Sequence, residues 1–394
     1  IAAAYADGRL KSTDILVLDG VPAEVPYVSG ILSLTPATPN SHVAILARSF
    51  GVPFGFPASA LLRSNLVAWA GREVAVRVTG YGCEVKPLAL EGPLDEALRA
   101  QWQALKQPPS LALTPKARLG VYSTNVTLLK PADVKYVGGK AANYGLLRRV
   151  LPTNSPPAIA LTFDLWDDFL AQTLPDGATL REAIAGHLGA FTYPPDIGQV
   201  RNQLSLVRDL IRRTAHFSPG QQQAILSLLQ DSGLPWMRQL RFRSSTNVED
   251  TEQFTGAGLY DSYSGCLPDD LDGDGVGPSA CDATEADERG VFRAIQRVYA
   301  SFYNENAFLE RLRHQVKEDQ VGMAILVAES FPDEDELANG VTTLNWDASF
   351  SFISANFDMV TQPGAESVTN PDPAARPELV QGYNSGGPGQ TVYL

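Results

Sequence analysis

The sequence predicts a multidomain protein of mixed α/β and α+β class. Two apolar segments with strand character, residues 15–19 and 73–78, flank a short helix that opens at His42, which is the pattern of a small layered β/α domain. Farther along the chain, helical periodicity at 197–214 alternates with strand character at 323–328. The chain has 394 residues and is 44% hydrophobic, so it is large enough for two or three domains with substantial cores.

The domain boundaries follow from where these patterns stop. The first domain is expected to cover residues 1–88. Residues 89–118 are predicted to form a linker, because prolines interrupt its partly helical spacing and stiffen the connection between two moving bodies. The second domain is expected to cover residues 119–394, with a helix at 219–231 and an insertion rich in aspartate and glycine at 266–288.

The segment 241–250 concentrates charge and hydroxyl groups. It reads RFRSSTNVED, and GAGLYDSY follows at 256–263. Arginine offers a planar fork of donors that matches phosphate oxygens, hydroxyls add short hydrogen bonds, and glycines let backbone N–H groups approach an anion. These features favour a polyphosphate-binding edge, and a basic strand followed by a polar hairpin is the alternative.

A second segment, 135–150, places two glycines before a lysine. Gly138 and Gly139 precede Lys140, and the pattern predicts a helix from about Ala141. A helix N-terminus exposes unpaired N–H groups, and a lysine there adds a positive charge for a phosphate. Because alanine follows the lysine, the segment is not a Walker A loop. A glycine-capped helix with a surface lysine explains the same residues.

A third segment, 38–53, contains a histidine at the start of a short apolar helix. His42 follows Asn40 and Ser41, and the helix is expected to end near Gly51. The positive end of a helix would stabilise a phosphoryl group carried on the imidazole ring. The alternative is a histidine in the first turn of a core helix, with Ser41 as the N-cap.

Together, the three segments resemble the dikinase family of phosphoenolpyruvate synthase, pyruvate phosphate dikinase and the glucan water dikinases, over roughly residues 15–380. The resemblance implies an ATP-grasp domain in which Lys140 and Arg243 hold ATP phosphates. The segments 292–303 and 322–327 are similar to a central helix and a core strand of that family. The residues expected to bind the nucleotide are Gly138, Gly139, Lys140, Arg243, Ser244 and Glu249.

The same resemblance implies a small swivelling β/α phosphohistidine domain in addition to the ATP-grasp domain. Residues 41–48 read SHVAILAR, so His42 would carry the phosphoryl group. The expected catalytic residues are therefore His42 and Arg243. ATP and Mg²⁺ are the expected cofactors, with Glu249 and Asp250 either orienting the arginine, assisting the metal or forming an ordinary salt bridge.

The expected function is a dikinase-type relay of a phosphoryl group from ATP through His42 to an acceptor. The histidine domain precedes the ATP-grasp domain, which favours a glucan as acceptor. Pyruvate and a small drug-like molecule are alternatives. A catalytically impaired ATP-binding or regulatory protein is the alternative from another class, because the family's Asp-Ile-Glu…Gln-x-Arg element is not found and Val327-Ala328 stands where the family often has Val-Gln.

The insertion contains alternating aspartates. Asp270, Asp272 and Asp274 precede Gly275, which is the opening of a calcium loop. Cys281 occupies the last loop position, where a bidentate glutamate is usual, so the prediction is a partial Ca²⁺ loop, with a solvated acidic turn as the alternative.

Two of the three cysteines bracket this insertion. Cys266 and Cys281 have a separation that could close a small disulfide loop. A disulfide would indicate an oxidising compartment, whereas ATP consumption favours the cytoplasm. The localisation stays open.

The net charge excludes two classes of partner. The 44 acidic and 31 basic residues give a formal charge of −13, so we expect neither nucleic acid nor an anionic membrane as a partner. No apolar run approaches the ~20 residues that span a bilayer, and the first residues lack the pattern of a signal peptide. Because the chain does not begin with methionine, we expect residue 1 not to be the start of the gene product.

Overall fold

The computed structural model describes most of the chain, and it divides into two compact units. Unit 1 comprises 1–14, 49–51 and 89–330, and unit 2 comprises 15–48, 52–88 and 331–394. The predicted domain boundaries at residues 88 and 118 stay predictions. The described residues are 4, 10, 11, 13–21, 28–36, 42–79, 82–88, 101, 110, 111, 113–193, 195–248, 259–273, 275–331, 335–347, 354–363, 378–384 and 390–393.

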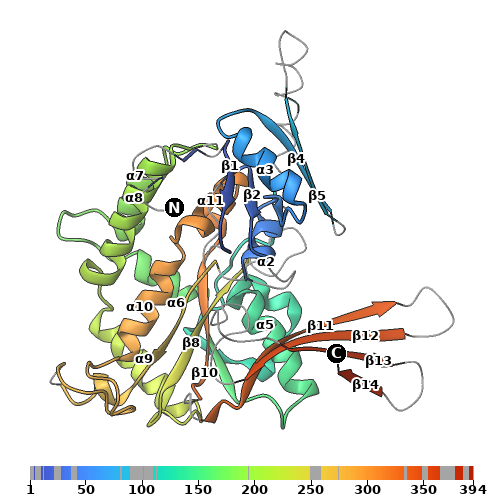
Figure 1. The fold of residues 1–394 in the computed structure, drawn as a ribbon. Coiled ribbons are helices and arrows are strands. Elements are labelled where there is room, and N and C mark those ends of the chain that lie inside the picture. Colours follow the sequence, from blue (N-terminus) through green and yellow to red (C-terminus); the bar gives the residue numbers. More distant parts are fainter. Residues whose placement is uncertain are drawn as a thin grey trace. The chain divides into compact units, whose positions relative to one another are not determined.

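Unit 1 is built on a five-stranded antiparallel sheet with the order β6-β7-β10-β8-β9. The predicted strand at 323–328 is confirmed as β10, the central strand of this sheet (Figure 1). Its unbroken apolar sequence MAILV is buried, as expected for a strand that is covered on both faces. The strands are β6 (Ser123–Asn125), β7 (Ala158–Leu161), β8 (Leu240–Thr246), β9 (Ser262–Gly265) and β10 (Met323–Glu329).

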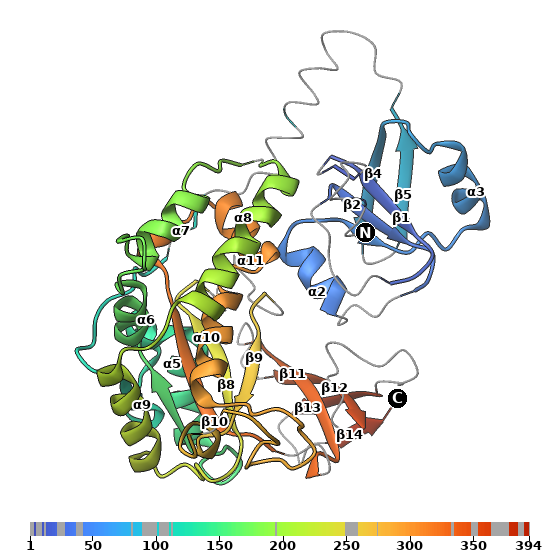
Figure 2. The same ribbon diagram turned by 90° about the vertical axis from the view of Figure 1, so that its left-hand side faces the viewer.

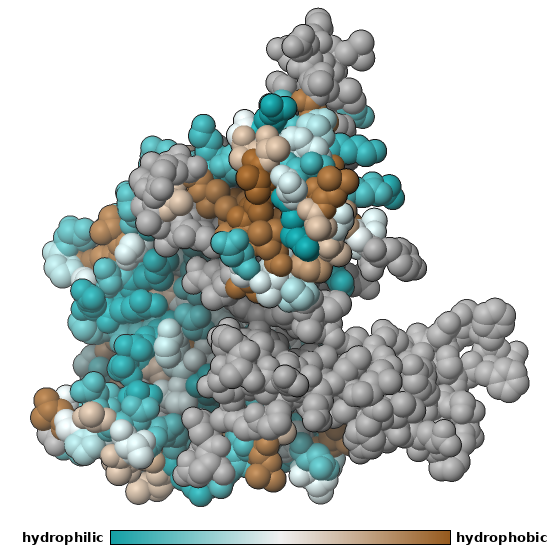
Figure 3. Space-filling view, in the orientation of Figure 1, coloured by the Kyte–Doolittle hydropathy of each residue, from teal (hydrophilic) through white to brown (hydrophobic). Residues whose placement is uncertain are grey.

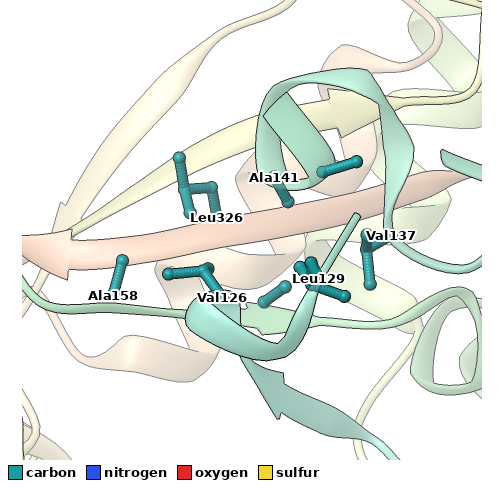
Figure 4. Packing of buried hydrophobic residues seen from close by; sticks show 8 residues of the cluster. Val126, Leu129, Val137, Ala141, Ala158 and Leu326 are labelled. Carbon is teal, nitrogen blue, oxygen red and sulfur yellow. The ribbon is translucent and has the colours of Figure 1, made fainter. Parts of the chain in front are cut away.

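One face of this sheet is covered by α5 (Val134–Val150). Val137 and Ala141 of this helix meet Leu326 of β10 in a small-residue core, together with side chains from β7 and from the 3-10 turn η1 (Val126–Leu128) (Figure 4). Because alanines occupy many of these positions, the helix backbone lies close to the strands. The cluster consists of Val126, Leu129, Val137, Ala141, Ala142, Ala158, Ala160 and Leu326.

The opposite face carries larger, aromatic side chains from α6 (Phe163–Leu170) and α10 (Val291–Ser301). The ring centroid of Trp166 lies 4.9 Å from that of Tyr299 and 5.2 Å from that of Phe302. Figure 2 shows β8 and β9 side by side, next to α10. These aromatic side chains are fully or almost fully buried, so they contribute to the hydrophobic core of unit 1 on this face of the sheet.

The remaining helices of unit 1 begin at residues that are typical N-caps. The predicted helix at 219–231 is confirmed as α9 (Pro219–Asp231), where Ser218 and Gln221 form a capping box. The predicted helical segment at 197–214 is confirmed as α8 (Ile197–Asp209) and the π-helical turn η3 (Leu210–Thr214). Two shorter helices of this unit are α7 (Leu180–Leu188) and α11 (Glu305–Arg313).

The insertion between β9 and α10 is closed by a disulfide bond. The structure shows the pairing of Cys266 with Cys281 that their spacing left possible, with the two Cα atoms 5.7 Å apart. Within the insertion, η4 (Pro268–Asp270) contributes Asp269, a buried carboxylate that accepts hydrogen bonds from the amides of Ala280 and Arg289, at 2.7 Å each. The conformation of the insertion is thus held by one covalent bond and by hydrogen bonds.

The first part of unit 2 contains a parallel sheet and two helices. The predicted strands at 15–19 and 73–78 and the helix at His42 are confirmed as β1, β4 and α2, whereas the parallel sheet and the second helix were not predicted. Its sheet has the order β1-β2-β3, and Leu32, Leu66 and Val85 form its core. Figure 3 shows hydrophobic side chains gathered over β1, β2 and α3, where Leu61 and Val67 are exposed. The elements are β1 (Ile15–Leu18), β2 (Gly30–Ser33), α2 (His42–Ser49), β3 (Phe54–Gly55), α3 (Ala60–Ala68) and the hairpin of β4 (Val74–Thr79) and β5 (Gly82–Pro87).

The last part of unit 2 is an antiparallel sheet with the order β11-β12-β13-β14. Its strands are β11 (Ala338–Asp347), β12 (Ser354–Pro363), β13 (Glu378–Asn384) and β14 (Gln390–Tyr393). The mixed α/β class is therefore confirmed, and the swivelling phosphohistidine domain stays a prediction. Among the helices that the structure describes, none is long and apolar enough to cross a membrane.

Candidate nucleotide-binding site

The predicted helix from about Ala141 is confirmed as the main part of α5, which begins earlier, at Val134, and has a kink at Gly138. Residues on both sides of Gly138 belong to the helix, but Gly138 itself has φ 76° and ψ 171°. Glycine adopts such a positive φ without steric cost, whereas other residues rarely do. A Cβ atom at Gly138 would also overlap the carbonyl group of Ser245 and lie 2.6 Å from its Oγ atom. The position therefore requires glycine for two independent reasons.

The side chain of Ser245, on β8, spans this break. Its hydroxyl donates a hydrogen bond to the carbonyl oxygen of Val137 at 2.7 Å and accepts one from the amide of Ala141 at 3.0 Å. The serine is fully buried. Because buried backbone groups need partners, this hydroxyl satisfies two groups that the break would otherwise leave unpaired.

Lys140 lies inside the broken turn and contacts the neighbouring serine. Its Nζ atom donates a hydrogen bond to Oγ of Ser244 at 3.2 Å, across a sequence separation of 104 residues. Ser244 is fully buried, whereas Lys140 is partly exposed. The structure thus brings together two of the three sequence segments that predicted phosphate binding.

Arg243 is exposed on β8 next to these residues, and it pairs in register with Leu326 of β10 and Ser262 of β9. Within the described part of the chain, its guanidinium has no hydrogen-bond or ion-pair partner. Burial raises the pKa of Tyr144 on α5, and the positive charges of Arg148 and Arg243 act against this rise. The charge of Arg243 therefore acts on a side chain of α5, the helix that carries Lys140.

Asn247 is a residue of the motif whose role the sequence did not reveal. Its Nδ2 group donates hydrogen bonds to the carbonyl oxygens of Thr114 and Gln320, at 2.9 Å each, and its Oδ1 atom accepts one from the amide of Gly322 at 3.1 Å. A buried amide that connects three chain segments holds the end of β8 in place. The only sequence signal for this role is a polar residue at the end of an apolar strand.

Other predicted site residues are placed only in part. His42 begins α2 as predicted, but its side chain lies outside the described residues, as do Glu249, Asp250 and Asp274. The predicted roles of these residues stay predictions.

Asp270 has a structural role that the sequence did not reveal. Burial raises its pKa to about 6, while hydrogen bonds from the amides of Val291 and Phe292, the first residues of α10, act to lower it. Gly290 has no side chain to cap this helix, and a Cβ atom there would overlap the Asp270 carboxylate. Asp270 therefore caps α10 from the insertion. The calcium loop stays a prediction, and in the described residues no cluster of three or more potential metal ligands is present.

Comparison with known proteins agrees with this geometry. The model of the family described as pyruvate phosphate dikinase, AMP/ATP-binding domain, matches residues 134–355, a range that begins with α5 and includes β8, α10 and β10. The rifampicin phosphotransferase of Streptomyces sviceus is 25% identical over 263 residues, which are 65% of this chain and 27% of that protein. The chain thus corresponds to a little over a quarter of the length of this relative. Because the family model matches more than half of the chain, the protein belongs to the pyruvate phosphate dikinase AMP/ATP-binding domain family.

Proposed function

We propose that the protein is an ATP-dependent phosphotransferase of the dikinase type, which passes a phosphoryl group from ATP through His42 to a small molecule with a hydroxyl group. The observation that carries the proposal is the contact of the Gly138–Lys140 turn with Ser244 and Ser245, which places Lys140 beside the strand of Arg243. The membership in a family with an AMP/ATP-binding domain supports it.

The chemistry of the site suits a polyphosphate. Lys140 supplies a point charge with rotatable donors, and Arg243 supplies a planar fork that matches two phosphate oxygens. Because Arg243 is exposed and unpaired among the described residues, a ligand would not have to displace an existing ion pair. Charges that are already in place stabilise the negative charge of the transferring group without reorganisation.

Magnesium ions accompany ATP in phosphoryl transfer and neutralise charge on the phosphates. Mg²⁺ is commonly held by phosphate oxygens, water and one or two carboxylates. The described residues contain no group of three or more potential metal ligands, and ATP itself would provide phosphate oxygens as ligands. Glu249 and Asp250, which lie outside the described residues, are the candidate protein ligands.

The transfer through His42 takes two balanced steps. A neutral ring nitrogen attacks a phosphorus atom of ATP, so that a P–N bond forms while the P–O bond to the nucleotide breaks. Attack at the γ-phosphorus releases ADP; attack at the β-phosphorus releases AMP, and water then removes the terminal phosphate. The acceptor hydroxyl then attacks the same phosphorus, the P–N bond breaks, and the hydroxyl proton is released. The position of His42 at the start of α2 suits this role, because a helix N-terminus favours the neutral imidazole and stabilises the phosphorylated ring.

A small molecule is the acceptor class that the comparisons favour. The name of the relative identifies rifampicin, a small molecule, as its phosphoryl acceptor. The glucan predicted from domain order receives no support from the comparisons. We therefore rank a small hydroxyl compound first, and pyruvate and glucan are the acceptors against which it is tested.

The test is to incubate the full chain with ATP labelled with ³²P at the β- or the γ-phosphate, and then to map the labelled peptide. We expect an acid-labile, base-stable label on His42 that is absent from His42→Ala and present in His216→Ala, a control at an exposed histidine. The labelled protein is then supplied with rifampicin, pyruvate or soluble glucan. Label on another residue would exclude the relay, and ATP binding without any label would favour a non-catalytic ATP-binding protein.

A further inference from the structure

The hydroxyl of Ser245 takes the place of one helical hydrogen bond. In an uninterrupted α-helix the amide of Ala141 would donate to the carbonyl oxygen of Val137, four residues earlier. In this protein both groups bond to Ser245 instead, so the hydroxyl is inserted between them. Insertion of a side chain into the helical ladder is a known cause of helix kinks. The kink at Gly138 therefore has its cause on another strand of the sheet.

The inserted hydroxyl determines where Lys140 can lie. The opened turn contains Gly138, Gly139 and Lys140, and only the Gly138 backbone departs from helical geometry. If the hydroxyl were absent, two buried groups would lose their partners, or the turn would close into a regular helix. Either change moves the backbone that carries Lys140, and the direct contact of Lys140 with Ser244 then no longer fits.

We infer that Ser245 is a positioning residue, which holds the turn at Gly138 open so that Lys140 is presented to the phosphates of the nucleotide. The inference rests on the proposed nucleotide site, but it does not depend on transfer to His42. It assigns different roles to two adjacent serines. Ser244 contacts the ammonium group, and Ser245 shapes the turn from which that group extends.

The experiment is a double-mutant cycle on ATP affinity, measured by isothermal titration in the presence of Mg²⁺. Ser245→Ala is expected to weaken ATP binding about tenfold, the size of one lost charge-assisted contact. In a Lys140→Met background, the same substitution is expected to have almost no further effect, because the group through which it acts is gone. Ser301→Ala is the control, since Ser301 is also fully buried and its hydroxyl bonds the carbonyl oxygen of Val298 at 2.7 Å.

A substitution that merely loosens the protein would give a different pattern. It would lower the free energy of unfolding, and it would lower the ATP affinity by the same factor whether residue 140 is lysine or methionine. Ser301→Ala would then lower both quantities as well. Equal losses with and without Lys140 would overturn the inference, as would wild-type affinity in Ser245→Ala. Absence of ATP binding to the wild-type protein would overturn it together with the proposed function. Bound ATP without labelled His42 would refute only the relay.

A second variant covers the case in which Ser245→Ala is too unstable to measure. Ser245→Cys keeps nearly the same size, but a thiol is a weak donor and a weak acceptor. We expect it to fold and still to bind ATP several-fold more weakly than the wild type, by the same reasoning on the lost hydrogen bonds. Wild-type affinity in this variant would show that the shape of the side chain, and not its hydroxyl, matters for Lys140.

Discussion

Gly138 shows how strongly a single residue of the site is constrained. Its positive φ and its contact with Ser245 both exclude a side chain. We predict that Gly138→Ala lowers the free energy of unfolding by roughly 2–4 kcal/mol, because backbone strain and steric overlap add. Urea denaturation measures the loss. Gly177→Ala is the matched control, because Gly177 also has a positive φ, 92°, but open space around it, so about 1 kcal/mol of strain is expected alone.

Arg243 differs from its neighbours on β8 in being exposed and unpaired among the described residues. We predict that Arg243→Gln weakens ATP binding at least about tenfold while stability changes little, because the guanidinium contacts a ligand and not the protein. Arg238→Gln is the control, since Arg238 is an exposed arginine in an ion pair with Glu329. Equal effects of both substitutions on ATP affinity would argue against a phosphate contact at Arg243.

The candidate phosphate-binding residues could be named from the sequence, but their arrangement could not. Lys140 and Arg243 stand in short motifs with distinctive spacing. The kink at Gly138, by contrast, is caused by Ser245, more than one hundred residues away. Local periodicity therefore placed the helix start at about Ala141 and did not reveal the helical turn that precedes the kink at Gly138. Asn247 was missed for the same reason, since its partners lie in distant segments.

At the level of elements, the insertion is tied to α10 by Asp270 and closed by the Cys266–Cys281 bond. The helical segments and the strand β10 could be predicted from periodicity. The spacing of the two cysteines left their pairing possible. The role of Asp270 could not be predicted, because alternating aspartates have the same sequence signature whether they bind a cation or cap a distant helix. The sheet order, which interleaves early and late strands, also depends on contacts that no local pattern encodes.

The burial of Asp270 makes stability depend on pH. Burial raises the pKa of Asp270 to about 6 from an ordinary value of 3.8, the charges of Asp269 and Asp272 add to the rise, and the amides of α10 oppose it. Folding therefore favours the protonated carboxyl. This contribution is fully present below about pH 4 and is lost as the pH rises through 6, up to a limit of about 3 kcal/mol.

We therefore predict that Asp270→Asn gains stability relative to the wild type as the pH is raised from 4 to 7, because its amide keeps the acceptor oxygen without the charge. Urea denaturation across this range, with a chelator present, measures the difference. Asp231→Asn, at an exposed aspartate that ends α9, should leave the pH profile unchanged. A constant difference between Asp270→Asn and the wild type at every pH would contradict the prediction.

The disulfide is expected to stabilise the fold by restricting the unfolded chain. Its cysteines are 15 residues apart, and closure of a loop of this size is worth about 3 kcal/mol. We predict that a reductant lowers the melting temperature of the wild type and has no effect on the double variant Cys266→Ser/Cys281→Ser. The reduced wild type and the double variant should then melt at similar temperatures. A wild type that is insensitive to complete reduction would show that the bond adds no stability.

At the scale of the whole molecule, nucleotide binding and phosphoryl transfer are assigned to different units. Lys140, Arg243 and Ser245 belong to unit 1, whereas His42 belongs to unit 2. The acidic character of the chain, with a net charge of −13, gives no general attraction for ATP, so affinity must come from the local charges of unit 1. Binding and labelling should consequently be separable by single substitutions.

This separation can be measured by the effect of ATP on thermal stability. A ligand at one hundred times its Kd stabilises the folded state by about 2.7 kcal/mol. We predict that His42→Ala keeps the full stabilisation by ATP although it accepts no label, and that Lys140→Met loses most of the stabilisation. A non-hydrolysable analogue of ATP serves as a control, because it should stabilise the wild type without transferring a phosphoryl group to it. Loss of the stabilisation by ATP in His42→Ala would mean that the histidine itself takes part in nucleotide binding. It would contradict the assignment of nucleotide binding to unit 1 alone.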